Sequence, residues 1–205
     1  MTRRRSEAYF CVCHHSILYK NFGVFLNVVV SIKFLYHRQI HCFMRYLSGD
    51  EEKVAMHFLD VASKQARFAT CQRSKCGTVI VKDGQIIGDG FNSPPHDLES
   101  QRKCLIDKDK YHKKVADKTC CVHAEQRAII DALKKNPEKI IGSRLYFIRL
   151  DLDNNILKAG KPYCTHCSKL ALDSGIKEFV LWHDEGICVY DTEEYNEISF
   201  GYRSD

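Results

Sequence analysis

Two short segments of the chain carry side chains that can together bind a metal ion and move a proton. Residues 123–125 read His-Ala-Glu, and residues 164–167 read Cys-Thr-His-Cys. One imidazole and two thiolates, from His123, Cys164 and Cys167, are the ligand types and the ligand number of a catalytic zinc, whose fourth tetrahedral position stays open to water. A structural zinc is normally closed by four protein ligands. The pattern therefore predicts a catalytic zinc site.

Glu125 lies two residues after the predicted ligand His123. We expect its carboxylate to take a proton from water at the zinc rather than to bind the ion, and we expect His166 to point away into solvent. A lone Cys-x-x-Cys also fits a redox pair or half of a structural zinc site, and a lone His-x-Glu is close to chance. The two together, each beside an expected helix start, favour the catalytic interpretation.

His-x-Glu followed by Pro-Cys-x-x-Cys is the signature of the zinc nucleobase deaminases, and the chain resembles the cytidine and deoxycytidylate deaminase superfamily. The resemblance covers roughly residues 49–186. It rests on four segments: Gly77-Thr-Val-Ile-Val-Lys-Asp-Gly, Gly88-Asp-Gly-Phe-Asn, His123-Ala-Glu-Gln-Arg-Ala-Ile-Ile and Gly175-Ile-Lys-Glu-Phe-Val.

Two positions depart from the usual pattern of that family. Tyr163 intervenes between Pro162 and Cys164, where the family has proline directly before the first cysteine. Arg127 stands where deoxycytidylate deaminases commonly have asparagine. The first departure affects the shape of the cysteine loop, and the second affects the choice of substrate.

The resemblance implies an α/β fold, a three-layer α/β/α sandwich with a mixed sheet of about five strands. It also implies that Asn92 contacts the substrate, whereas an ordinary turn asparagine is the alternative. Some members carry a second, structural zinc, and the ligands that match here are Cys71, Cys104 and Cys120 (or Cys121), with Cys76 or His96 as a fourth ligand. Free thiols are the alternative. The family also commonly forms homo-oligomers.

The implied reaction is zinc-dependent hydrolytic deamination of a cytosine nucleotide or nucleoside, deoxycytidylate-like, with release of ammonia. The Pro-Cys-x-Met-Cys of tRNA adenosine deaminases and the Pro-Cys-Gly-x-Cys of free cytidine deaminases are absent. A phosphate group would find Arg127, Lys161 or basic residues of the 102–118 segment, and the sequence does not choose among them. The alternatives are another amino-bearing base, a nucleic acid, or a non-catalytic zinc-binding module of the same fold.

The distribution of charge argues against a nucleic-acid partner. Residues 1–43 hold six Lys/Arg and one Glu, which accounts for the whole net charge of +5, and the rest of the chain is formally neutral. The basic, aromatic 1–43 segment is expected to be a leader outside the fold. Met44 is then the working start and 44–205 the deaminase domain, and a targeting or anchoring segment is the alternative.

No membrane association is expected of the domain. The clustered cysteines suit a reducing, cytoplasmic compartment.

The apolar periodicity and the turn residues predict the elements that position these side chains. Helices are expected over 50–68, 121–133 and 164–172, and strands over 77–81, 85–91, 145–150 and 178–182. Asp83-Gly84 predicts a tight hairpin between the first two strands, and the last two strands are expected to be parallel. Gly88 and Gly90 suggest a close backbone approach, as at a ligand site. Residues 151–159 are expected to lie outside the sheet, and the segment after Asp184 is not assigned.

Overall fold

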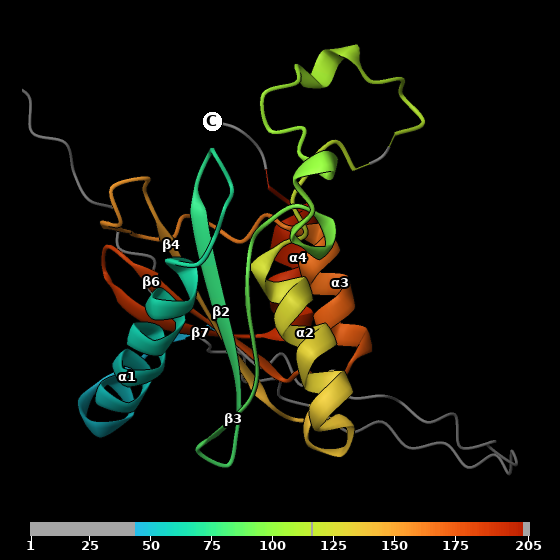
Figure 1. Ribbon diagram of the computed structural model, residues 1–205. Helices are drawn as coiled ribbons and strands as arrows, with labels where there is room; N and C mark the ends of the chain where they lie inside the picture. Colours follow the sequence, from blue (N-terminus) through green and yellow to red (C-terminus); the bar gives the residue numbers. More distant parts are fainter. Residues whose placement is uncertain (1–43, 116, 203–205) are drawn as a thin grey trace, which may run out of the picture. The chain divides into compact units, whose positions relative to one another are not determined.

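A computed structural model of the protein describes residues 44–115 and 117–202, so the predicted leader 1–43 lies outside the described residues. A mixed sheet lies at its centre, with strand order β1-β7-β6-β4-β2-β3 and β5 paired to the end of β4 (Figure 1). The strands are β1 (Arg45–Tyr46), β2 (Lys75–Lys82), β3 (Gln85–Phe91), β4 (Arg144–Leu150), β5 (Ile156–Leu157), β6 (Glu178–His183) and β7 (Gly186–Asp191).

Helices cover both faces of this sheet (Figure 1). They are α1 (Gly49–Ala66), α2 (Ala124–Lys135), α3 (Thr165–Asp173) and α4 (Thr192–Phe200), with short 3-10 turns at Pro95–Asp97, Glu99–Gln101, Lys108–Lys110 and Pro137–Lys139. Side chains alternate across β4, so Tyr146 and Ile148 pack in the α1 core, whereas Leu145 and Phe147 pack in the core of the other helices. The predicted three-layer α/β/α sandwich is confirmed.

The predicted hairpin and crossover are both present. β2 and β3 pair antiparallel around Asp83 and Gly84, whose φ angles of 49° and 74° are those of a type I′ turn. β4 and β6 pair parallel, and α3 lies between them in the chain, as a crossover connection requires. This crossover carries the Cys-x-x-Cys segment back across the sheet to the start of α3.

The glycines of β3 let helix α2 approach the sheet closely. A Cβ atom on Gly88 would lie 2.6 Å from the carbonyl oxygen of Ala128, and one on Gly90 would lie 2.5 Å from that of Ala124. Neither distance is compatible with a side chain. The close approach predicted for these glycines therefore exists, but its partner is the backbone of α2, the helix that begins directly after His123.

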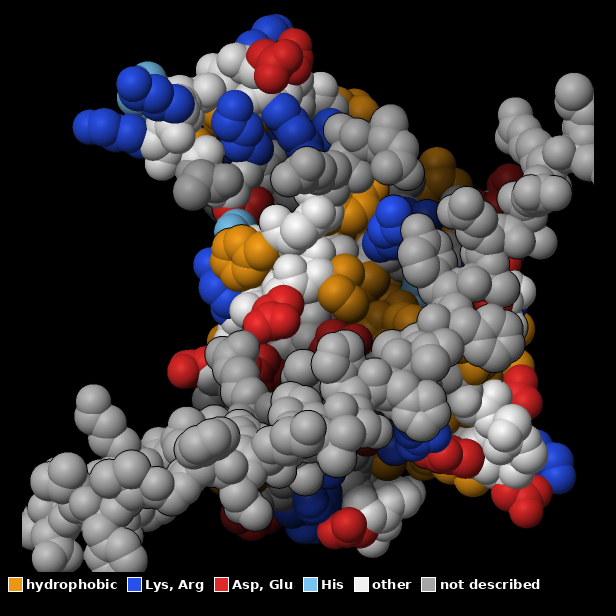
Figure 2. All heavy atoms as spheres, turned by 180° about the vertical axis from the view of Figure 1, so that it is seen from behind, with side chains coloured by type: hydrophobic (Ala, Val, Ile, Leu, Met, Phe, Trp, Pro, Cys, Tyr) orange, Lys and Arg blue, Asp and Glu red, His pale blue; other side chains and the backbone are white. Residues whose placement is uncertain are grey.

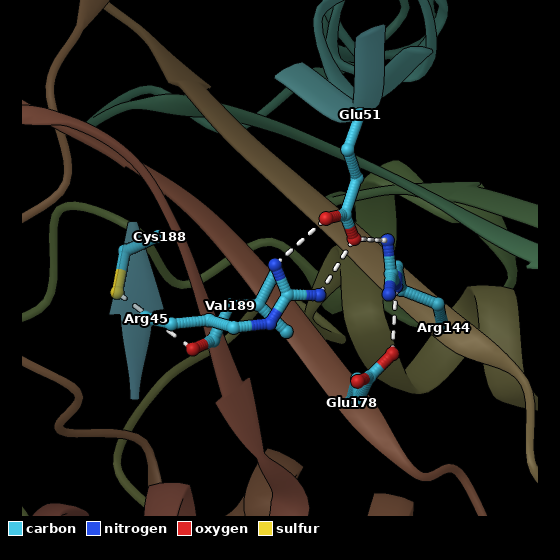
Figure 3. A network of polar contacts seen from close by, with 6 residues as sticks. All are labelled: Arg45, Glu51, Arg144, Glu178, Cys188 and Val189. Carbon is cyan, nitrogen blue, oxygen red and sulfur yellow. Dashed lines mark hydrogen bonds and ion pairs between the residues drawn. The ribbon is translucent and has the colours of Figure 1, made fainter. Parts of the chain in front are cut away.

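Ion pairs tie the first strand and helix to the middle of the sheet (Figure 3). Arg45 of β1 donates two hydrogen bonds, of 2.6 and 2.7 Å, to the Glu51 carboxylate of α1, and these bonds lower the pKa of Glu51. Arg144 of β4 donates to Glu51 at 3.3 Å and to Glu178 of β6 at 2.7 Å. Because Arg144 and Glu178 are mostly shielded from water, this network orients four elements more firmly than isolated surface pairs can.

Two sequence-based expectations were wrong in detail, and one segment is not assigned by the sequence. Helix α2 begins at Ala124, not at Cys121, because Val122 pairs with Ser93 in an isolated bridge and holds the preceding residues extended. The 151–159 segment is not wholly outside the sheet, since Leu157 pairs with Arg149. The unassigned tail forms β7 and α4. Among the described residues, no helix has both the length and the apolarity needed to cross a membrane.

The close packing of β3 on α2 gives the first testable prediction. We expect Gly90→Ala to lower the free energy of unfolding by about 1–3 kcal/mol, because the new methyl group must push α2 away from the sheet. Gly160→Ala is the matched control, since a Cβ atom there meets nothing within 4 Å. Chemical denaturation measures both variants. Equal stability of the two would contradict the packing described here.

Candidate active site

The three predicted metal ligands lie at the first turns of two helices. His123 is the N-cap residue of α2, where its backbone N–H donates to the Gln126 side chain at 3.1 Å. Cys164 is the N-cap residue of α3, and Cys167 lies three residues further on. Side chains spaced in this way lie on one side of a helix, and the positive end of the helix dipole favours thiolates there.

The donor atoms of these residues converge. His123 Nδ1 lies 3.3 Å from Cys164 Sγ and 3.2 Å from Cys167 Sγ, and the two sulfur atoms are 3.1 Å apart. Zinc bonds of about 2.0–2.3 Å in a tetrahedron separate ligand atoms by about 3.5 Å, so small outward shifts fit an ion between these three atoms. The structure thus brings together all three residues of the predicted set.

The protonation of this group also suits a cation. The hydrogen bonds of Cys164 with Cys167 and His123 lower the pKa of the Cys164 thiol to about 4, so it is a thiolate at neutral pH. The Cys164 thiolate raises the pKa of His123 to about 9, and it raises the pKa of Cys167 well above the usual range. Without a metal the set thus pairs the Cys164 thiolate with a protonated His123, and binding of a divalent ion would displace the protons on His123 and Cys167.

Glu125 occupies the second position of α2 and is 6% exposed. His123 and Glu125 would not share a face inside a regular helix, but His123 is the N-cap residue, so both side chains face the site. Burial raises the pKa of the Glu125 carboxyl group, and the positive charge of His123 opposes that shift. A buried carboxyl with a raised pKa can both accept and return a proton near neutral pH, as a general acid–base requires.

A cavity of about 160 Å³ opens in front of these residues. His123 and Glu125 lie in its wall together with Asn92, Phe147 and Tyr163. The sequence does not predict Phe147 as a site residue, because its only signal is its position in an apolar strand. Tyr163 stands out in the sequence through its place in the motif, but nothing there predicts that it lines the cavity.

Asn92 is in the cavity wall, and its amide group already has two partners. Its Oδ1 accepts from the backbone N–H of Cys76 at 2.8 Å, and its Nδ2 donates to the carbonyl oxygen of Ser74 at 3.1 Å. These bonds fix the start of β2 beside the cavity. The predicted contact of Asn92 with a substrate stays a prediction.

A second group of thiols lies in the wall of the same cavity. The sulfur atoms of Cys71, Cys104 and Cys121 all lie within 4.8 Å of one another. Cys120 Sγ is 3.0 Å from Cys104 Sγ and 3.6 Å from Cys121 Sγ. Of the two alternatives for the third ligand, Cys121 thus completes the compact set, and Cys120 stands next to it as a fourth thiol.

The other two candidates for a fourth ligand, Cys76 and His96, are not part of this compact set. Cys76 is in the cavity wall, where burial raises the pKa of its thiol to about 12. His96 lines a separate hollow with Arg127. His166 is about half exposed, and its Nδ1 lies 3.8 Å from the Asp117 carboxylate, so it points away from the thiols as expected.

Basic side chains surround the cavity mouth. Figure 2 shows Lys and Arg gathered on the segment that projects at the upper left, which is the long connection between β3 and α2 in Figure 1. Three lysines of this connection line the cavity with Arg73: they are Lys103, Lys108 and Lys118. Arg127 is instead engaged with Pro94 O at 2.8 Å and Asp97 at 3.3 Å, and Lys161 lines a neighbouring hollow.

Comparison with known proteins agrees with this site. The family described as "Cytidine and deoxycytidylate deaminase zinc-binding region" matches residues 51–183, and the chain belongs to this family. Its metal is therefore zinc. A deoxycytidylate deaminase of Mycobacterium phage D29 is 30% identical over 130 residues, which is 60% of this chain and 90% of the relative.

Two further proteins are similar to parts of the chain. A deoxycytidylate deaminase of Schizosaccharomyces pombe is 26% identical over 127 residues, 60% of this chain and 35% of that longer protein. The crystal structure of a dCMP deaminase from the cyanophage S-TIM5 in complex with dCMP and dUMP is 25% identical, with a TM-score of 0.45, over 65% of this chain and 82% of that one.

The two bonds of Asn92 give the second prediction. Asn92→Ala should lower the free energy of unfolding by about 1–3 kcal/mol, because it leaves the N–H of Cys76 and the carbonyl oxygen of Ser74 without partners. Gln85→Ala removes an exposed amide and should leave stability within about 0.5 kcal/mol of the original. Thermal or urea unfolding distinguishes the two. An unchanged Asn92→Ala protein would show that these bonds do not hold the start of β2.

Proposed function

We propose that the protein is a zinc-dependent hydrolytic deaminase that converts a cytosine nucleotide, deoxycytidylate, to the uracil nucleotide with release of ammonia. The observation that carries this proposal is the buried Glu125 carboxyl beside the convergent donors His123, Cys164 and Cys167. Three donors leave one position of a tetrahedral ion open, and the cavity lies in front of them.

His123, Cys164 and Cys167 would hold the zinc. When bound, the ion supplies Lewis acidity, which lowers the pKa of a coordinated water towards neutrality. A purely structural site would have no use for a buried carboxyl at this place. The position of Glu125 therefore favours the enzyme over a non-catalytic zinc-binding module with the same fold.

Glu125 carries the proton through the reaction. Its carboxylate accepts a proton from the water that attacks C4 of the cytosine ring. The protonated carboxyl gives this proton to the ring nitrogen. It then takes the remaining proton from the new hydroxyl group on C4 and gives it to the amino group, so that the C–N bond breaks, the C4 carbonyl forms and ammonia departs. Burial favours the neutral form of the carboxyl between these steps, which keeps the proton available for delivery.

The charges of the cavity wall support a nucleotide over a free nucleoside. Among the described side chains that line the cavity, Arg73, Lys103, Lys108 and Lys118 are basic and Glu125 is acidic. A phosphate group is the part of the substrate that this excess of cations suits, because lysine and arginine bind phosphate oxygens through charge-assisted hydrogen bonds. The deoxycytidylate deaminases among the relatives support the same choice.

The second thiol group is proposed as a structural zinc site. Its ligands are Cys71, Cys104 and Cys121, with Cys120 as the fourth, because four thiolates close a tetrahedral ion. Burial opposes ionisation of Cys104, but hydrogen bonds with Cys120, the backbone of Gln72 and Arg102 lower its pKa to about 7. Such an ion would tie the start of β2 to the connection that carries the lysines.

The remaining features of the proposal concern the whole chain. Residues 44–205 are proposed as the deaminase domain and 1–43 as a leader outside it, which agrees with the 51–183 span of the family match.

A cytoplasmic location is proposed because the metal-binding thiols must stay reduced, and the eight described cysteines are all free. The resemblance to the deaminases also suggests a homo-oligomer, which light scattering of the purified protein would test.

The role of Glu125 gives the third prediction. Glu125→Ala should keep its zinc and lose turnover of dCMP by about 10²–10⁴-fold or more, because the proton transfers lose their carrier. Glu138→Gln alters an exposed carboxylate and should leave the rate unchanged. Ammonia release and zinc content are measured on the same samples. Substantial activity in Glu125→Ala would contradict the assignment.

The second zinc gives the fourth prediction. The purified protein should contain two zinc ions per chain, Cys104→Ser one, and Cys164→Ser one, because each substitution removes a ligand from a different site. Cys188→Ala is the control, since Cys188 is buried away from both groups and should leave two ions. Elemental analysis counts the metal. One zinc ion per chain in the unaltered protein would contradict the proposed structural zinc site.

A further inference from the structure

We propose that Tyr163 is a specificity-determining residue whose ring packs against the pyrimidine ring of the substrate and is held in place by Tyr202. This inference rests on the proposed function. It concerns the residue at which the chain departs from the usual Pro-Cys-x-x-Cys pattern.

The position of Tyr163 is fixed by its neighbour. It directly precedes Cys164, the N-cap residue of α3 and a proposed zinc ligand, so its backbone cannot move far without disturbing the metal site. Tyr163 and Phe147 are the aromatic side chains in the wall of the cavity that contains Glu125. An aromatic ring is thus placed close to where the reacting base must lie.

Tyr163 also lines a second hollow. Tyr163 and Phe147 line both the main cavity and a smaller hollow of about 30 Å³ beside it, which Arg149 and Lys161 also line. Tyr163 is thus part of the wall of both hollows.

A large part of the Tyr163 side chain is uncovered. The residue is 54% exposed, although it lines the same cavity as the buried Glu125. A flat cytosine ring that enters the cavity can cover this surface, and contact between an aromatic side chain and a base is favourable for any base because each has a π-face. The exposed ring is thus a surface that a substrate, rather than the protein itself, would bury.

Tyr202, two residues after the end of α4, contacts the ring of Tyr163. The rings of Tyr163 and Tyr202 lie 5.8 Å apart at 53°, a tilted aromatic contact. Tyr202 follows α4, which is anchored to α3 by the hydrogen bond from Ser168 to Asn196 and to the core by the stacking of Tyr195 on Phe179. The C-terminal helix thereby has a role in the site although it contributes no ligand.

The test compares variants of the full chain with dCMP as substrate and dUMP as a binding probe. Tyr163→Ala should raise KM for dCMP, and weaken dUMP binding, by about 5–100-fold, while kcat stays within about threefold and zinc content is unchanged. Tyr163→Phe should keep the KM for dCMP and the dUMP affinity of the unaltered protein, because the ring and not the hydroxyl makes the contact. Tyr202→Ala should raise KM by a smaller factor than Tyr163→Ala, since it removes only the support.

Phe200→Ala is the control for general damage to the C-terminal segment, because Phe200 is 64% exposed on α4 and is not part of the cavity wall. An unchanged KM in Tyr163→Ala would overturn the inference, and so would a loss of zinc in that variant or a failure of Tyr163→Phe to restore binding. Failure of the unaltered protein to deaminate dCMP would instead contradict the proposed function. The dUMP affinities of the variants would still test the role of Tyr163.

Discussion

The site depends on the convergence of two helix N-termini at one place above the sheet. His123 begins α2 and Cys164 begins α3, so each ligand sits where the backbone turns into a helix and unpaired N–H groups favour negative charge. Neither segment could hold an ion alone, because one supplies an imidazole and the other two thiols. The fold brings them together over 41 residues of sequence, with His123 Nδ1 and Cys164 Sγ 3.3 Å apart.

Backbone contacts, more than side-chain charges, set the position of α2, the helix that carries Glu125. Gly88 and Gly90 allow α2 to lie against β3 at a distance that no side chain would permit. At the end of β3, Asn92 then holds the start of β2 through two backbone groups. These constraints together place His123 and Glu125 at the cavity. The apolar layers on the two faces of the sheet then supply the stability that keeps them there.

The sequence predicted the ligands and the layer architecture well because both follow from local patterns. The motif residues carry their own spacing, and the Asp83-Gly84 turn and the alternating strand residues set the hairpin. The start of α2 was misplaced because the pairing of Val122 with Ser93 is a long-range contact that leaves no local signal. For the same reason the sequence could not show which of Cys120 and Cys121 completes the second thiol group, nor that Tyr202 would reach Tyr163.

The most direct test of the account is a crystal structure of the zinc-loaded protein with anomalous data collected at the zinc edge. We expect an anomalous peak within bonding distance of His123 Nδ1, Cys164 Sγ and Cys167 Sγ, with the Glu125 carboxylate facing the remaining coordination position. A peak absent from this place, or a fourth protein ligand that fills the remaining position, would contradict it.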